Sequence, residues 1–496
     1  MATDWIPFPL TAPIGGLDFS KPENLLGHVY TQDMENSIIA DGVVLNRPGY
    51  TTIGTFPSAL PVMEGVEFGD DSGSLHNVFI TTQNIVELTT PTTWSAKTGN
   101  NFTGDETNPI FAAPVGGLST ESLYITNGTD TMRVWTGSGN WSVLTTTGFT
   151  TLKAGCLIGF KGHLVLGDTT EDGDVFPYRI RWSTSGNPTT WNTVSAGFAN
   201  LIEDQNNSKV MCMHPFGNNL VVYKEDCIYL LTYQGDPNYF VGRMMIADRG
   251  TISRKAVAPF GDAHLVVTKD NIHIFNGNGF IRPAIGEKIK KDFFDRLNWD
   301  ARGTVHAKTF SSRFEVWIFF PEGADTSPQS AYCWNYKDNT WTYHTFSEDI
   351  YSSMEFVQAF SQIQPLVGLD TDVAKFMEGT DDDGTAISSH WRTKLHDYRE
   401  LNDRLAIRNK TAARAEWDIA TASPNPKVQV GVTNTLLGTI TYETAQTIVN
   451  GDNSIKKSDH RSTGRFLTWK MTNDSGSASF NVAQFIPYLE IREANR

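Results

Sequence analysis

The segment Leu220-Val-Val-Tyr-Lys-Glu-Asp-Cys-Ile-Tyr-Leu-Leu231 returns, one residue shorter, as Leu265-Val-Val-Thr-Lys-Asp-Asn-Ile-His-Ile-Phe275. Each copy has an apolar strand, a polar turn and a second strand of β-branched and aromatic residues, which is the pattern of a β-hairpin. Pro-Phe-Gly precedes both copies, at 215–217 and 259–261. The copies start 45 residues apart (265 − 220), which is the length of a propeller blade. The repeat predicts a β-propeller, whose sheets must stack around an axis because none can bury both faces alone.

Looser copies of this hairpin fill the rest of the first 380 residues. They lie at Val78–Leu88, Leu123–Trp135, Leu164–Trp182, Phe314–Tyr336 and Leu366–Phe376. Seven hairpins in all fit a propeller of about six to eight blades. The alternative is a pair of irregular β-sandwiches whose hairpins happen to be evenly spaced, as in most all-β chains.

Composition also indicates an all-β chain. The 496 residues include 42 Gly, 29 Phe, 15 Tyr and 13 Trp, and Ala- or Leu-rich helical stretches are missing. One helix is expected over Gly286–Leu297, because Ile289, Phe293 and Leu297 recur every four residues on one face. We expect it to pack against the edge of a blade.

The C-terminal part follows a different pattern and is predicted to form a small β-sandwich. Its expected strands are Lys427–Val432, Leu437–Tyr442, Phe466–Met471 and Phe480–Ile491, separated by turns rich in Asn, Asp, Gly and Ser. For Leu395–Lys410 we favour two strands around Glu400–Asp403 over a charged helix, because Leu405 and Ile407 alternate with other residues. The expected domains are an N-terminal arm and turn motif at 1–56, a β-propeller at 57–384 and a C-terminal β-sandwich at 385–496. The arm either crosses to the sandwich or adds a strand to the last blade.

Neither a membrane span nor a secretory signal is visible. No stretch approaches eighteen apolar residues, and the opening Met-Ala-Thr-Asp-Trp-Ile-Pro lacks a basic region followed by an apolar one. We therefore expect folding in the cytosol, or export by a route other than standard secretion. The cysteines are spread singly, without zinc-ligand spacing, and are expected to be buried thiols: Cys156, Cys212, Cys227 and Cys333.

Charge divides along the expected domain boundary. The chain carries −15 overall; residues 391–496 have 15 basic and 11 acidic residues (+4), which leaves −19 for residues 1–390. The excess of Lys and Arg is either solvated surface or a means of docking an acidic body onto an acidic partner. The acidic body argues against tight DNA binding, which needs Lys and Arg along the phosphates. It suits a conduit through which DNA slides without sticking.

Motifs for catalysis and for metal binding are missing from the sequence. It contains no Gly-x-Ser-x-Gly elbow, Walker loop, His-Glu-x-x-His pair or strict EF-hand loop, so we expect no catalytic, cofactor-binding or metal-ligating residues. Two carboxylates, Asp370 and Asp372, are spaced to share one face of a strand, and they are the alternative candidates for a glycosidase pair or a calcium site. Aspartates in turns are more often solvated. Single histidines in strands (His163, His264, His273 and His344) are expected to be packing residues.

The opening of the chain contains three phrases in a fixed order and spacing: Pro9–Leu17 (ending in Gly-Gly-Leu), Met34-Glu-Asn-Ser37 and Gly42–Tyr50 (ending in Arg-Pro-Gly-Tyr). In this order and spacing the opening resembles the tail nozzle, or packaged-DNA stabilisation, proteins of short-tailed bacteriophages. Further similar segments run from the middle to the end of the chain: Arg179-Ile-Arg-Trp-Ser183 with Gly186-Asn-Pro and Trp191, then Trp391-Arg-Thr-Lys394, then Phe485-Ile-Pro-Tyr-Leu-Glu-Ile-Arg492.

The resemblance implies a mechanical function in the virion tail. The family forms a nozzle below the portal and adaptor rings, which retains packaged DNA, passes it at ejection and carries fibres. The implied assembly is a homo-hexamer formed in the host cytoplasm, without cofactors, stable membrane insertion or sequence-specific DNA binding. A ring of six has closed cyclic symmetry with heterologous contacts. The competing hypotheses are a carbohydrate-binding or glycan-degrading propeller, such as a receptor-binding tail protein, and an adhesion propeller of a bacterial surface.

The residues of these phrases predict structural roles. Pro48 and Gly49 are expected to form a tight turn that joins two strands between Arg47 and Tyr50. Asn36 is expected to bond local backbone. Trp182, Trp191 and, in the C-terminal phrase, Trp391 are structural motif residues, and the first two are expected to bury large aromatic area.

Overall fold

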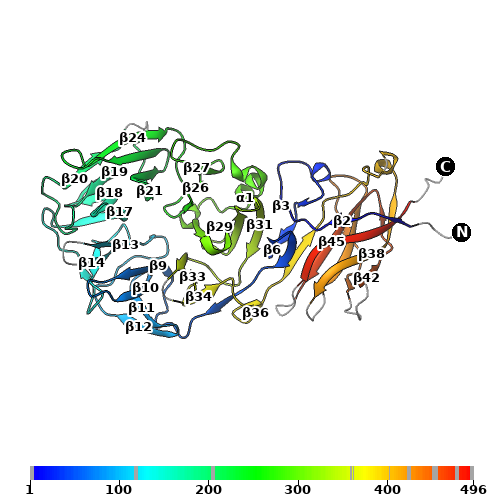
Figure 1. The fold of residues 1–496 in the computed structure, drawn as a ribbon, viewed down its shortest axis with the longest axis horizontal. Coiled ribbons are helices and arrows are strands. Elements are labelled where there is room, and N and C mark those ends of the chain that lie inside the picture. The colour runs from blue at the N-terminus through cyan, green and yellow to red at the C-terminus, as the bar shows by residue number, and fades with distance from the viewer. Residues whose placement is uncertain are drawn as a thin grey trace.

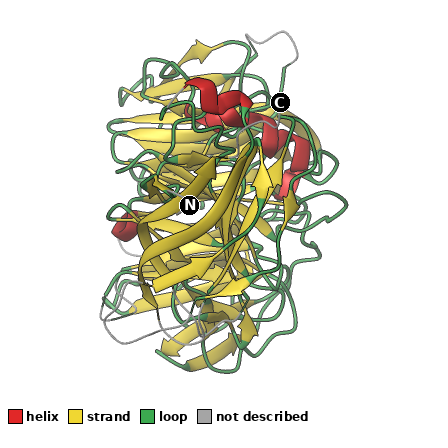
Figure 2. Cartoon of the chain, turned by 90° about the vertical axis from the view of Figure 1, so that its right-hand side faces the viewer, coloured by secondary structure: helices red, strands yellow, loops and turns green. Residues whose placement is uncertain are grey.

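The computed structural model describes residues 5–116, 121–202, 207–357, 360, 362–401, 403–421, 426–448, 456–474 and 480–491. A ring of β-sheets lies beside a smaller two-sheet unit (Figure 1). Turned by 90°, the two-sheet unit faces the viewer with its long strands in front (Figure 2). Within these residues no helix is long and apolar enough to cross a membrane.

The ring is a β-propeller. In the described part of the chain, seven antiparallel sheets follow one another around it; six use consecutive strands, and the last also takes β8 (Tyr50–Thr52) from the N-terminal arm. The first strands of successive sheets contact one another, as β9 does β13 and β32 does β9. The strands are β9–β12 (Val62–Gly69, Leu75–Thr81, Ile85–Thr90, Thr93–Lys97), β13–β16 (Phe111–Gly116, Glu121–Thr126, Arg133–Trp135, Ser142–Val143), β17–β20 (Leu152–Phe160, His163–Glu171, Asp174–Trp182, Gly197–Asn200), β21–β24 (Val210–Phe216, Asn219–Lys224, Ile228–Tyr233, Phe240–Ile246), β25–β27 (Val257–Phe260, Ala263–Val267, Ile272–Phe275), β28–β31 (His306–Phe310, Glu315–Phe320, Ser330–Asn335, Thr340–Thr345) and β32–β34 (Ser352–Phe356, Gln364–Gly368, Val373–Phe376).

The predicted hairpins correspond to the middle of each sheet. Leu220–Leu231 spans β22 and β23, paired Val221↔Leu230, and Leu265–Phe275 spans β26 and β27, paired Leu265↔Ile274. The five looser copies likewise span the second and third strands of their sheets. Their apolar residues are buried between neighbouring sheets, and this burial explains why the pattern repeats. The predicted fold class, a propeller followed by a sandwich, is confirmed.

The second unit is the C-terminal β-sandwich. One sheet has the order β42-β38-β45-β7-β6, with β1, β2 and β43 at its margins, and the other runs β5-β37-β44-β39-β40, with β41 on β39. The strands are β1 (Ile6–Pro7), β2 (Leu10–Thr11), β5 (Met34–Glu35), β6 (Ser37–Ala40), β7 (Val43–Asn46), β37 (Ser389–Arg392), β38 (Lys410–Thr421), β39 (Lys427–Thr433), β40 (Thr441–Tyr442), β41 (Gln446–Thr447), β42 (Lys456–Asp459), β43 (Thr463–Gly464), β44 (Phe466–Asn473) and β45 (Phe480–Ile491). Two short pairs complete the described strands: β3 (Gly16–Leu17) with β4 (Tyr30–Thr31), and β35 (Asp381–Asp382) with β36 (Thr385–Ala386) beside β8.

The N-terminal arm does both things that the sequence left open. Strands β1, β2, β6 and β7 join the sandwich, whereas β8 pairs antiparallel with β34 and so completes the last propeller sheet. The chain therefore passes from one domain to the other between Asn46 and Tyr50. This short crossing ties the sandwich to the closure of the propeller.

Two local predictions need adjustment. The expected helix is a 3₁₀ turn, η2 (Ile285–Lys288), followed by α1 (Lys290–Arg296); Phe293 is buried and packs on Phe320 as expected. The two strands favoured around Glu400–Asp403 are wrong, because the described residues there form a 3₁₀ helix, η5 (Asp403–Ile407). Leu405 is buried while Ile407 is 76% exposed, so the alternation that suggested a strand comes from a single turn of helix. The remaining 3₁₀ turns are η1 (Glu23–Leu25), η3 (Arg302–Thr304) and η4 (Ser311–Arg313).

The prediction of a tight turn at Pro48-Gly49 is also wrong. Residues 47–49 are an irregular crossing between sheets of different domains, and Gly49 is not in the left-handed region. Glycine is needed here for a different reason. A Cβ at position 49 would lie 1.7 Å from the carbonyl oxygen of Asp381, and backbone cannot move aside as a flexible side chain can.

We predict that Gly49→Val prevents folding. The substituted Cβ would push β8 away from β34 and β35, and the last propeller sheet would stay open. Expression and circular dichroism should show insoluble or unfolded protein. The control is Gly69→Val, since a Cβ at Gly69 meets nothing within 4 Å. Soluble, folded Gly49→Val protein would contradict the prediction.

Candidate functional site at the domain junction

The junction between propeller and sandwich is the candidate site, because most of the family-like phrases meet there. Strand β5 lies between β31 of the propeller and β37 of the sandwich. Glu35 pairs with Tyr343 on one side and with His390 on the other, so one sheet runs through both domains. A continuous apolar core accompanies it and includes Trp341 of the propeller and Trp469 of the sandwich.

Arg47 is the central polar residue of the junction. Its side chain is fully buried, and its Nη1 and Nη2 atoms donate to the two carboxylate oxygens of Asp382 at 3.0 and 2.8 Å. Nη2 also donates to the carbonyl of Thr345 at 3.1 Å, and the guanidinium lies 4.5 Å from the ring centre of Phe346. A bidentate, buried pair of this kind fixes geometry in a way that a solvated pair cannot. The arm is thereby fastened to the propeller and to the β35–β36 hairpin.

Asn36 bonds distant residues, contrary to the local role expected of it. Its amide nitrogen donates to Thr345 Oγ1 and to the carbonyl of Ser388, both at 3.0 Å, and its amide oxygen accepts from the backbone N–H of Thr345. Asn36 also adopts a positive φ of 50°, which Asn tolerates better than most residues. One side chain thus links the arm, the propeller and the segment that enters β37.

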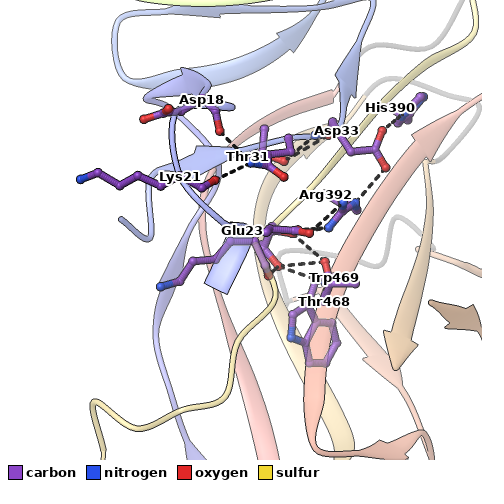
Figure 3. Close-up of polar contacts among 12 residues, drawn as sticks. Asp18, Lys21, Glu23, Thr31, Asp33, His390, Arg392, Thr468 and Trp469 are labelled. Atoms are coloured by element: carbon purple, nitrogen blue, oxygen red, sulfur yellow. Dashed lines mark hydrogen bonds and ion pairs between the residues drawn. The ribbon is translucent and has the colours of Figure 1, made fainter. Parts of the chain in front are cut away.

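A second polar cluster fastens the arm to the sandwich (Figure 3). Asp33 accepts from Arg392 Nε at 2.9 Å and contacts His390 Nε2 at 2.6 Å, and Arg392 forms an ion pair with Glu23. Burial acts to raise the pKa of Asp33, but the hydrogen bond and charge of His390, with the charge of Arg392, outweigh it. The pKa of Asp33 is therefore held well below its usual range. Lys394 adds a buried hydrogen bond from Nζ to the carbonyl of Leu26 at 2.7 Å.

The three tryptophans of the family-like phrases lie in two places. Trp391 is fully buried at the junction, 6.4 Å from the ring of Phe485. Trp182 and Trp191 are buried too, but they belong to the propeller sheet β17–β20 and its neighbours. Of the predicted motif residues, Arg47, Pro48, Gly49, Tyr50 and Trp391 are therefore brought together, and Trp182 and Trp191 are not.

The alternative carboxylates do not share the face of a strand. Asp370 and Asp372 lie in the turn between β33 and β34, where the backbone N–H of Leu369 bonds the carbonyl of Asp372. Burial, and then the nearby charge of Asp383, raise the pKa of Asp372. Within the described residues, no group of three or more His, Cys, Asp or Glu side chains is placed to hold a metal ion.

Sequence reasoning missed the partners of the junction residues. Asp382, Glu23, Asp33 and His390 were not singled out as site residues. The signal for Arg392 was its place in the Trp-Arg-Thr-Lys phrase, directly after a tryptophan at the end of β37. The partners lie 335 to 369 residues away along the chain, beyond the reach of any spacing rule.

Comparison with known proteins gives fold likeness alone. No family model and no curated protein matches the chain. Among solved structures, it resembles PorZ, a bacterial surface component of the type-IX secretion system of Porphyromonas gingivalis (10% identity, TM-score 0.37, covering 68% of this chain and 38% of that one). It also resembles the extracellular domain of a putative one-component system of B. thetaiotaomicron (10%, 0.40, covering 82% and 48%) and the AfRom2 CNH domain (10%, 0.38, covering 66% and 99%). The chain thus spans less than half of PorZ.

We predict that Arg47→Met costs about 3–5 kcal/mol of unfolding free energy, because it leaves Asp382 buried without its cation. The double variant Arg47→Met/Asp382→Asn should recover part of that loss, and urea unfolding of all three proteins would measure the coupling. Lys291→Met is the control, since it breaks an ion pair with Asp295 whose side chains are 78% and 62% exposed. That variant should cost about 0.5 kcal/mol or less. Equal losses for Arg47→Met and Lys291→Met would contradict the prediction.

We further predict that Asp33→Asn removes acid-sensitive stability. A carboxylate with a depressed folded pKa stabilises the fold above its unfolded value, about 3.9, and that contribution is lost as pH falls toward the folded pKa. Partial exposure limits the loss at pH 7 to roughly 1–2 kcal/mol. Wild type and Asp33→Asn should therefore differ at pH 7, and the gap should begin to narrow below about pH 4 and keep narrowing as pH falls toward the folded pKa. Asp41→Asn, at a 91% exposed side chain, should follow wild type throughout; a constant gap between Asp33→Asn and wild type would contradict the assignment.

Proposed function

We propose that this protein is a structural subunit of a short-tailed bacteriophage tail, which forms the nozzle below the portal and adaptor rings. The observation that supports this most is spatial. Gly16, Met34 to Ser37, Arg47 to Tyr50, Trp391 and Phe485 come from phrases near the two ends of the chain, and in the folded protein they lie at one junction, whereas the phrase around Trp182 and Trp191 lies in the propeller. A resemblance made of scattered chance matches would have no reason to converge on one place.

The contacts within that junction connect the phrases directly. Met34 pairs with Trp391 in adjacent strands, and Leu10 pairs with Phe485. Gly16, at a φ of +76°, lies against the backbone of Trp341, where a Cβ would be 2.4 Å from the carbonyl oxygen. Two of these contacts, Met34 with Trp391 and Leu10 with Phe485, join one phrase directly to another. The proposal therefore rests on the way several phrases meet at the domain joint and not on any single motif.

The proposed role is mechanical and needs neither catalysis nor a cofactor. Six copies would form a closed ring in the virion tail after assembly in the host cytoplasm, with the portal or adaptor ring and the tail fibres as partners. The charge of −19 on residues 1–390 would disfavour adhesion of DNA passing through the lumen. Rigidly joined domains would suit a part that must hold packaged DNA back until ejection.

A carbohydrate-active propeller is the second candidate. One observation favours it: the pKa of Glu348 is raised, by burial first and then by the charges of Asp372, Asp383 and Asp370. A carboxylic acid with a raised pKa is what glycoside hydrolysis uses as its proton donor. Loss of glycan hydrolysis in Asp372→Asn, in a protein that stays monomeric or trimeric, would favour this candidate over the nozzle.

Electron microscopy of the purified protein, alone and mixed with its candidate portal or adaptor ring, tests the nozzle proposal. We expect sixfold rings or stacked tubes with an axial hole, and rings that cap the portal. Arg47→Met, with its joint weakened, should form fewer rings, whereas the surface variant Lys291→Met should assemble as wild type does. A dispersed monomer that does not bind the portal or adaptor ring would overturn the proposal.

A further inference from the structure

The centre of the propeller holds a cavity of about 390 Å³. Its walls come from the first strand of every sheet, β9, β13, β17, β21, β25, β28 and β32, so the cavity lies at the axis of the ring shown in Figure 1. This volume falls within the range of small-molecule sites, about 300–1,000 Å³.

Two of the three cations that line the cavity are already paired. Arg254 forms an ion pair with Asp168, and its Nη1 donates to the carbonyl of Val210 at 3.1 Å. Lys255 forms an ion pair with Glu64, and its ammonium lies 4.0 Å from the ring centre of Phe111. These pairs close the cavity wall without adding net charge.

The third cation, Lys308 on β28, has no hydrogen-bond or ion-pair partner among the residues that the structure describes. Two carboxylates, Glu64 and Glu355, lie close enough for their charges to act on Lys308, but both are bound to other groups. Glu64 forms an ion pair with Lys255, and Glu355 accepts hydrogen bonds from the hydroxyls and N–H groups of Ser311 and Ser312. Burial lowers the pKa of Lys308, and Lys255 lowers it further, against the pull of Glu64 and Glu355. An unpaired ammonium in such a place gains from an added anion.

The remaining lining is neutral and largely apolar. Burial holds the pKa of His214 at about 3 and that of His306 at about 4, so both rings are uncharged at neutral pH. Met63, Leu157 and Met213 supply apolar surface. The cavity therefore combines one uncompensated positive charge with an apolar wall.

We propose that this cavity binds a small organic monocarboxylate. The carboxylate pairs with the ammonium of Lys308, and the apolar body of the ligand packs against the methionine and leucine side chains. One unpaired cation matches one negative charge, so a dianion such as phosphate would leave a charge unmatched in the cavity. The site is independent of the nozzle proposal, since it lies within a single propeller.

Calorimetric titration with hexanoate, at pH 7.5, tests the site. Hexanol and hexylamine are the matched probes, because they keep the chain and change the charge of the head group. We expect hexanoate to bind at least about tenfold more tightly than hexanol, since a charge-assisted hydrogen bond contributes about 1.5–3 kcal/mol. Hexylamine should not bind. Equal affinity for hexanoate and hexanol, or no binding of hexanoate, would overturn the proposal.

Variants locate the binding at Lys308. Lys308→Met should weaken hexanoate binding about 10- to 100-fold, Lys308→Arg should retain it, and the exposed-site control Lys337→Met should leave it unchanged. Wild-type affinity should fall as pH rises from 7.5 to 10, because the Lys308 ammonium loses its proton. Lys308→Met should not show the loss of affinity that comes from deprotonation of Lys308. The other charged or titratable groups are the same in both proteins, so their contributions cancel in that difference. Those lining the cavity are Glu64, His214, Arg254, Lys255, His306 and Tyr351, and Glu355 acts on Lys308 through its charge.

Unfolding curves show whether each variant is folded. Unchanged affinity in folded Lys308→Met would overturn the assignment. If Lys308→Met does not fold, the comparison of hexanoate with hexanol on wild type and on Lys308→Arg decides the question instead.

Discussion

The structure depends on one crossing of the chain, from β7 of the sandwich to β8 of the propeller. Three residues span it, and the arrangement leaves no space for a side chain at Gly49, whose Cα lies against the backbone of Asp381. Because the chain crosses here, β8 can pair with β34 and complete the last propeller sheet. The ring of sheets is then closed. A propeller needs such closure because an open sheet would present unpaired backbone groups and an uncovered apolar face.

Buried charge makes this crossing specific. An arginine–carboxylate pair taken out of water gains little net stability over a well-packed apolar pair, but it is costly to separate. Any register of the arm that keeps Arg47 away from Asp382 therefore leaves two buried charges unpaired and is less stable. Asn36 and the Glu23–Arg392–Asp33 cluster act in the same way at other points along the arm. These contacts can all form only in one arrangement of the sandwich relative to the propeller.

The features that could be predicted from the sequence are those that repeat along the chain. The hairpins were predictable because each blade buries the same faces, so apolar residues recur in the second and third strands, as at Val221 and Leu265. The destination of the arm was not predictable, since Arg47 and Asp382 have no pattern that connects them. The prediction of strands around Glu400–Asp403 was wrong because Leu405 and Ile407, two apolar residues spaced by two in a short 3₁₀ turn, have the same spacing as alternating residues in a strand. Gly49 was expected to serve a tight turn, whereas glycine is required there by a close approach to the backbone of Asp381 that only the fold creates.

The propeller's own axis bears on how a tail conduit would be built. The walls of the central cavity are side chains from every sheet, and paired ions such as Lys255 with Glu64 cross between them, so each propeller is closed at its centre to all but small molecules. In the proposed ring, the path for DNA must therefore run between subunits and not through any one of them. The acidic part of the chain, residues 1–390, can then face a shared lumen, while the single uncompensated cation, Lys308, lies in the central cavity of its own propeller and away from that lumen.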